Sequence, residues 1–133
     1  MSDGNLTEKY RINFKGFGLP DNALSLIPKM DIIEVNLKGD LQYPNTNKYF
    51  DENIISLKSS TTYENGFEPA INDLIRFLKG KNDLLELFRK CNDIELQLWI
   101  DSDDENRVPS IHFTPEQLSF LAELKVHIDI DIV

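Results

Sequence analysis

The C-terminal third of the chain shows the clearest alternation of apolar and polar side chains. Aliphatic residues stand at every second position in two segments: Ile94, Leu96, Leu98 and Ile100 in the first, and Val126, Ile128, Ile130 and Ile132 in the second. Because a strand turns successive side chains to opposite faces, each segment predicts a strand with one aliphatic and one polar face. A helix beginning near Thr114 is predicted between them. Its apolar residues, which we expect to cover the aliphatic face, are Leu118, Leu121, Ala122 and Leu124.

The first two thirds of the chain predict further strands and helices separated by turn residues. Alternating patterns predict strands at 10–14, 33–37 and 54–62, with a short strand at 110–113. A short helix is expected to begin at Asp21 or Asn22, either of which can act as the N-cap, and to end before Pro28. Two adjacent helices are predicted, one with Pro69 near its first turn and Gly80 at its end, and one over 82–90.

This order of elements predicts an α+β fold in a single domain spanning 1–133, with residues 1–7 expected to be disordered. Strands are not regularly interleaved with helices, which favours a largely antiparallel sheet with the helices packed mainly on one face. The opposite face is expected to be partly solvated. It would carry Glu95, Gln97, Trp99, His127, Asp129 and Asp131.

The charge of the chain restricts the partners that it can attract. Fourteen basic and 23 acidic residues give a net charge of −9, and this field repels nucleic acid and anionic membranes but attracts a basic protein. A general solubility role for the acidic residues stays open as an alternative. No apolar run approaches the roughly 20 residues that span a bilayer. With one cysteine, Cys91, and a polar N-terminal segment, we expect a cytoplasmic protein.

Candidate catalytic and metal-binding chemistry is weak. The run His127-x-Asp129-x-Asp131 has metal-ligand residue types, but residues two apart on a strand lie roughly 6.6 Å apart and do not converge easily on one ion. The acidic loop 101–106 lacks the glycine and distal glutamate of an EF-hand. Cys91 lies near a helix C-terminus and outside any nucleophile motif. We therefore predict no catalytic residues, no metal and no cofactor.

A binding surface is the better supported hypothesis from these residues. Trp99, the only tryptophan, falls on the polar phase of its strand, although a loop or helix covering it is an open alternative. It shares that phase with Asp101, and the following loop adds further acids. The predicted partner-binding residues are Trp99, Asp101, Asp103, Asp104 and Glu105.

The C-terminal pattern also resembles a known family. The segment Ile111-His112-Phe113-Thr114-Pro115-Glu116-Gln117-Leu118, followed by Ile128-Asp129-Ile130-Asp131-Ile132, is similar to the C-terminal signature of small bacterial proteins catalogued as a domain of unknown function. Lys38-Gly39-Asp40 resembles a turn in the first half of that family, whereas Leu57 stands where the family usually has tryptophan. The resemblance implies an α+β fold and a bacterial cytosolic protein. It implies no activity, and it associates such proteins with an immunity-type role against secreted toxins.

Three hypotheses about function remain after the sequence is considered. The first is a non-catalytic, acidic protein-binding domain, of an immunity type that neutralises a basic partner or toxin. The second is a metal-dependent, hydrolase-like enzyme that uses the strand carrying His127, Asp129 and Asp131. The third is a structural or regulatory domain without a dedicated polar site. A concave pocket in which polar groups converge would favour the enzyme, and a broad face would favour the binding domain.

Overall fold

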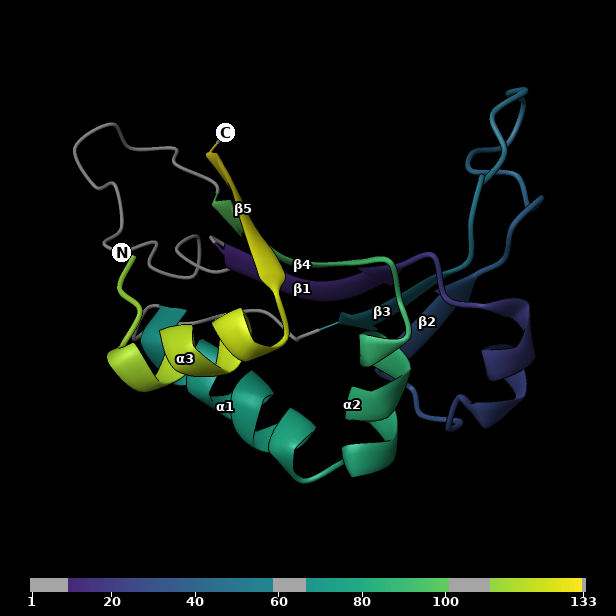
Figure 1. The fold of residues 1–133 in the computed structure, drawn as a ribbon. Coiled ribbons are helices and arrows are strands. Elements are labelled where there is room, and N and C mark those ends of the chain that lie inside the picture. The colour runs from purple at the N-terminus through teal and green to yellow at the C-terminus, as the bar shows by residue number, and fades with distance from the viewer. Residues whose placement is uncertain (1–9, 59–66, 101–110, 133) are drawn as a thin grey trace.

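The computed structural model describes residues 10–58, 67–100 and 111–132, and it confirms an α+β fold in which a five-stranded sheet is covered by helices (Figure 1). The strands are β1 (Tyr10–Phe17), β2 (Ile33–Asn36), β3 (Ile54–Lys58), β4 (Asp93–Ile100) and β5 (Val126–Ile132). The helices are the 3-10 helix η2 (Asp21–Leu26), α1 (Phe67–Lys79), α2 (Asn82–Arg89) and α3 (Pro115–Glu123). None of the helices described is long and apolar enough to cross a membrane.

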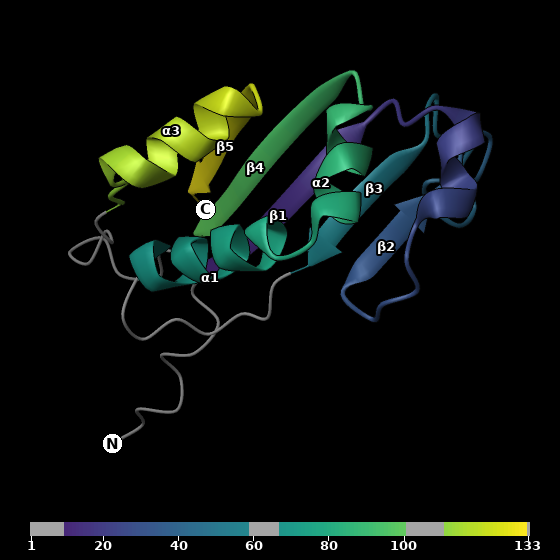
Figure 2. The same cartoon turned by 60° about the horizontal axis from the view of Figure 1, so that its bottom comes forward.

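The sheet has the order β2-β3-β1-β4-β5 and is largely antiparallel, as the sequence predicts. The β1–β3, β1–β4 and β2–β3 pairs are antiparallel, whereas β4 and β5 are parallel. A parallel pair needs a crossover connection, and α3 lies in that connection. Helices α1, α2 and α3 all lie on the same side of the sheet (Figures 1 and 2).

The core lies between this helical layer and one face of the sheet. The fully buried strand residues come from alternate positions of β1, β3 and β4: Ile12, Phe14, Ile55, Leu57, Leu96, Leu98 and Ile100. Phe88 of α2 meets Phe14 of β1 edge to face, with ring centroids 4.8 Å apart. Gly16 makes room for this contact, because a Cβ there would lie 2.5 Å from Cys91 Sγ and 2.9 Å from Phe88 Cδ1.

A buried asparagine, Asn53, connects the segments that precede β3 and follow β1 and β2. Asn53, just before β3, donates from Nδ2 to Leu19 O at 2.9 Å and to Asp21 Oδ1 at 2.7 Å. Its Oδ1 accepts a hydrogen bond from the Lys38 backbone N–H. Asn53 therefore ties the segment after β1 to the segment after β2.

Two details of the predicted local structure are wrong in the described residues. The expected short helix is formed, as the 3-10 helix Asp21–Leu26, but its N-cap is Pro20, without a side-chain capping bond, and not Asp21 or Asn22. Asp21 instead accepts from Asn53, so its carboxylate serves a tertiary contact. The expected strand at 110–113 is not formed over residues 111–113, which precede α3 without strand pairing. Ser110 lies outside the described residues, as do residues 1–7 and the predicted strand continuation at 59–62.

Helix α3 presents a different stripe to the core from the one expected. Its buried residues are Gln117 and Leu121, followed by Leu124, whereas Leu118 is 46% exposed. The spacing of four and three residues is that of one helix face. Gln117 therefore faces the core, where the apolar pattern predicts Leu118.

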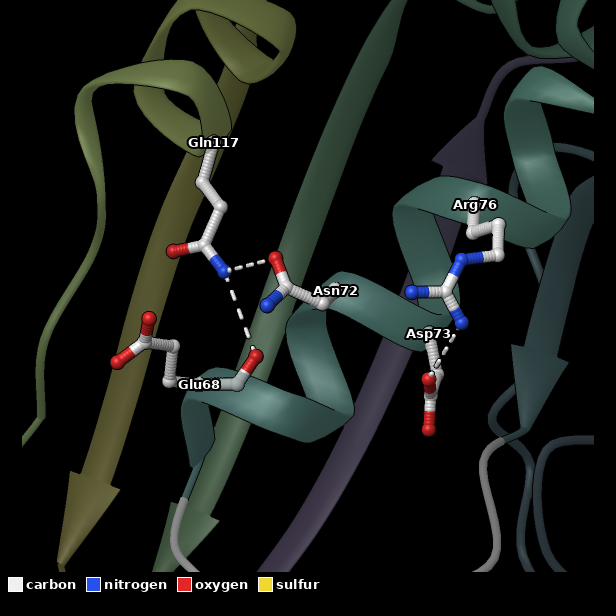
Figure 3. A network of polar contacts seen from close by, with 5 residues as sticks. All are labelled: Glu68, Asn72, Asp73, Arg76 and Gln117. Carbon is white, nitrogen blue, oxygen red and sulfur yellow. Dashed lines mark hydrogen bonds and ion pairs between the residues drawn. The ribbon is translucent and has the colours of Figure 1, made fainter.

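Gln117 can occupy this position because all its polar groups have partners. Its side-chain oxygen accepts from the Thr114 N–H at 2.8 Å, and its backbone N–H donates to Thr114 Oγ1 at 3.1 Å, which completes a capping box. Its Nε2 donates to Asn72 Oδ1 at 2.8 Å and to Glu68 O at 3.3 Å (Figure 3). One side chain therefore caps α3 and also fastens it to the first turns of α1.

The aliphatic side of β5 is only partly covered by α3. Val126 is half-buried, but Ile128, Ile130 and Ile132 are 38%, 41% and 54% exposed. The predicted phase is retained, because these residues are in register with the buried Leu96, Leu98 and Ile100 of β4. The strand lies at the edge of the sheet, beyond most of the helical cover.

Replacing Leu121 by alanine should lower the free energy of unfolding by about 2–5 kcal/mol, because the side chain is 2% exposed and its loss leaves a cavity. The matched control is Leu118→Ala on the same helix, which should change stability by about 0.5 kcal/mol or less. Urea denaturation of both variants makes the measurement. Equal losses would contradict the buried stripe of α3.

Gln117→Ala should cost more stability than Thr114→Ala. The threonine variant loses only its part of the cap, worth about 0.5–2 kcal/mol. The glutamine variant also leaves the Glu68 carbonyl and the Asn72 amide oxygen without their donor, a further cost of about 1–3 kcal/mol. Urea melts of both single variants and the double variant should show non-additive capping losses. A glutamine variant no less stable than the threonine variant would mean that the bonds to α1 contribute nothing.

Candidate functional site

The polar face of the sheet, opposite the helices, collects side chains from β1, β4 and β5. Antiparallel pairing of β1 with β4 and parallel pairing of β4 with β5 align these strands in rows. The rows are Lys15–Glu95–His127, Asn13–Gln97–Asp129 and Arg11–Trp99–Asp131. The expectation that Glu95, Gln97, Trp99, His127, Asp129 and Asp131 share one face is therefore confirmed.

Trp99 is half-buried in its row. The guanidinium carbon of Arg11 lies 5.1 Å from the centre of the indole ring, within the range of a cation–π contact. Asp131 stands in register on the other side, on β5. The Arg11 side chain thus lies over the ring, and Trp99 stands in register between a cationic and an anionic residue.

Charges of opposite sign are separated across this face. Arg11 and Lys15 lie on β1, and Lys58 on β3 forms an ion pair with Glu34 on β2. Four carboxylates lie on the adjacent pair of strands: Asp93 and Glu95 on β4, and Asp129 and Asp131 on β5. On the polar side of β4 and β5 the one side chain that can carry a positive charge is His127. Its Nε2 lies 3.8 Å from Asp93 Oδ1. We call the side chains of Asp93, Glu95, Asp129 and Asp131 the acidic face.

A shallow hollow of about 640 Å³ opens at one end of the acidic face. Its lining includes Glu52, from the segment before β3, beside Asp93, Glu95, His127 and Asp129. Carboxylates from three separate segments therefore border one concavity. Such a grouping concentrates negative potential and favours a cationic group over an anionic one.

The described part of the chain does not bring together the ligand cluster that the metal-binding hypothesis requires. His127, Asp129 and Asp131 follow one another along β5, and each stands opposite a different residue of β4. No group of three His, Cys, Asp or Glu side chains able to hold a metal ion occurs within residues 10–58, 67–100 and 111–132.

The predicted binding loop cannot be compared with the structure. Asp101, Asp103, Asp104 and Glu105 lie outside the described residues, and only Trp99 of the predicted set lies within them. The structure adds Arg11 and Glu52, which the sequence analysis did not select. Arg11 stands at a polar position of an alternating strand pattern, so the sequence indicates that it lies on the polar face. Its position beside Trp99 depends on the β1–β4 register, which the sequence does not give. Glu52 carries no such signal, since it lies in an irregular segment.

Cys91 is a half-buried thiol at the end of α2. Its Sγ donates to Leu87 O at 3.6 Å. Burial raises the pKa of the thiol to about 11, and the nearby charge of Glu52 adds to the increase. Because the thiolate is the nucleophile, this environment suppresses reactivity at neutral pH.

A comparison with protein families finds a match over most of the chain. The family model described as "Domain of unknown function (DUF4279)" matches residues 28–133, most of the chain, including β2 to β5 and all three α-helices. No curated protein and no solved structure matches the chain.

Alkylation of Cys91 by iodoacetamide should be slow at neutral pH and should increase with a midpoint near pH 11, following the thiolate fraction. Glu52→Gln should lower the pKa of the thiol and shift the rate profile toward lower pH, because it removes a negative charge that disfavours the thiolate. Asp51→Asn is the matched control and should leave the profile unchanged. A midpoint at or below pH 9 in the native protein would contradict the buried environment.

Proposed function

The chain belongs to the family described as a domain of unknown function (DUF4279), and we propose that it is a non-catalytic domain that binds a basic protein partner through its acidic face. The observation that carries the proposal is the placement of Asp93, Glu95, Asp129 and Asp131 on two adjacent strands of the same sheet face. Asp131 stands in register with the half-buried Trp99, and Asp93, Glu95 and Asp129 border a broad, shallow hollow. A wide face of this kind suits a protein surface better than it suits a small substrate.

The role that we propose is inhibition by occlusion, as an immunity-type protein covers a basic toxin. The net charge of −9 supports rapid capture of a cationic partner, because complementary charge accelerates encounter. Trp99 would supply apolar contact area at the centre of the bound surface, as aromatic residues commonly do at interfaces. The acids at 101, 103, 104 and 105 follow β4 directly in sequence and would extend the negative surface. We place this binding in the cytoplasm, in keeping with a chain that has a single cysteine.

The positive groups on β1 define the orientation of the partner. Arg11 and Lys15 stand beside the acidic face. Arg11 is in register with Trp99 on β4, and Trp99 is in register with Asp131 on β5. A partner whose basic residues cover β4 and β5 would therefore place acidic or neutral residues over β1. This arrangement gives specificity in addition to attraction, since a reversed orientation brings like charges together.

Binding of a lysine-rich peptide should be measured first, with Trp99 fluorescence as the readout because it is the only tryptophan. The variant Asp129→Asn/Asp131→Asn should weaken binding and flatten its salt dependence. The matched control, Asp31→Asn/Asp73→Asn, removes the same charge from exposed positions outside the acidic face and should have a smaller effect. Equal effects of the two double variants would show that the peptide responds only to total charge, and would contradict the proposed site.

With the natural basic partner, Trp99→Ala should mainly accelerate dissociation and weaken binding by about 2 kcal/mol or more. Neutralising Asp129 and Asp131 should mainly slow association. Tyr43→Ala is the control for removal of an aromatic side chain, because Tyr43 is 61% exposed and lies in the segment between β2 and β3. Surface-plasmon kinetics at low and high salt separate these effects. If the Trp99 variant dissociated at the native rate and substitutions in α1 or α2 abolished binding, the proposal would be wrong. The binding site would then lie on the helical face.

A further inference from the structure

The outer edge of β5 has no strand beside it within the described residues. The strand pairs with β4 on one side, and the sheet order places it last. An edge strand presents a row of unpaired backbone N–H and C=O groups, to which an extended segment of another chain can add. In β5 this row is seven residues long, and every residue after Val126 is exposed. The outer edge of β5 is therefore open to a partner.

The side chains on the two sides of this edge differ in chemistry. Ile128, Ile130 and Ile132 lie on the helical side, where α3 covers them only in part. Asp129 and Asp131 lie on the polar side, and neither has an ion-pair partner among the residues that the structure describes. A strand added at this edge would therefore meet aliphatic side chains on one side and carboxylates on the other.

We propose that an extended segment of the basic partner adds to the outer edge of β5 as a sixth strand of the sheet, an inference that rests on the proposed function. Its basic residues would stand at every second position, beside Asp129 and Asp131. Its aliphatic residues would stand at the positions between them, beside Ile128 and Ile130. Because side chains alternate in a strand of either direction, parallel and antiparallel addition require the same pattern in the partner.

The two aspartates of β5 determine which strands it favours. An acidic strand would bring carboxylates beside carboxylates, and like charges on neighbouring strands are destabilising. A strand with lysine or arginine at these positions forms pairs of opposite charge, which stabilise a sheet. The segment Val126–Ile132 contains neither proline nor lysine, two residues by which proteins commonly block an open edge. The charge pattern of β5 thus favours a basic strand over other strands.

The opposite edge of the sheet is less suited to the same partner. Strand β2 has only four residues, and its carboxylate Glu34 forms an ion pair with Lys58 of β3. A basic segment at β2 would gain fewer backbone hydrogen bonds, and its cations would compete with Lys58 for the carboxylate. Strand β5 also carries two of the four carboxylates of the acidic face, so an added strand there would be continuous with the proposed binding surface.

Calorimetric titration with two synthetic peptides tests the proposal. The first, Lys-Val-Lys-Val-Lys-Val-Lys, has the length of β5, and the second, Lys-Lys-Lys-Lys-Val-Val-Val, has the same composition and charge without the alternation. The alternating peptide should bind about tenfold more tightly, because only it can place all its lysines on one side of an added strand. Equal affinities would overturn strand addition and leave the acidic face as a site that responds to charge alone. Binding of neither peptide would contradict the proposed function as well.

Substitution on the aliphatic side of the edge separates strand addition from attraction by charge. Ile128→Ser/Ile130→Ser leaves the acidic face intact and should remove most of the preference for the alternating peptide, because the valines lose their contacts. The matched control is Leu26→Ser/Leu41→Ser, which changes two exposed leucines in η2 and in the segment between β2 and β3. The control should retain the full preference. An isoleucine variant that kept the preference would contradict the proposed position of the added strand.

Amide hydrogen exchange in the native chain, followed by mass spectrometry, measures the backbone pairing itself. Saturation with the alternating peptide should slow exchange in the fragment that covers Val126–Ile132, because the outward N–H groups of β5 acquire hydrogen-bond acceptors. Exchange in the fragment that covers Ile33–Asn36, the other edge strand, is the internal control and should not change. If the bound peptide left exchange in β5 unchanged, or protected β2 instead, the proposal would be overturned.

Discussion

The rest of the structure depends on the pairing of β4 with a neighbour on each side. Its apolar residues Leu96, Leu98 and Ile100 are at most 1% exposed, so the strand has one possible orientation relative to the helices. A slip by one residue would turn this whole row to the solvent, which makes the register costly to change. Once that orientation is set, Glu95, Gln97 and Trp99 must lie on the opposite face. The polar surface is thus a direct consequence of the burial of the core.

The parallel arrangement of β5 requires α3 to cross from one end of the sheet to the other. Gln117 holds this helix in two ways, since it closes the capping box with Thr114 and donates to Glu68 and Asn72 of α1. A buried polar side chain is stabilising only when its groups are paired, and here all of them are. The position of α3 leaves β5 projecting at the edge, with aliphatic side chains that its own chain covers incompletely.

The two surfaces that result have different chemistry. The acidic face attracts cationic groups through side-chain charge, with a half-buried tryptophan beside it, and favours association by electrostatic steering. The outer edge of β5 carries backbone groups that no strand within the described residues pairs, with partly exposed aliphatic side chains beside it. Asp129 and Asp131 belong to the acidic face, and they are carried by this same edge strand.

The alternating pattern of β4 and β5, the amphipathic helices and the α+β class were available from the sequence, because burial of one face imposes a period that local reading detects. The shared polar face of Glu95, Trp99, Asp129 and Asp131 followed from the same period. Tertiary structure alone decided that β4 and β5 are parallel, that Arg11 lies over Trp99, and that Glu52 joins the hollow. It also placed Gln117 in the core and left Ile128 and Ile130 exposed. These features depend on contacts between residues far apart in the chain, and no local pattern specifies which strand becomes the neighbour or which becomes the edge.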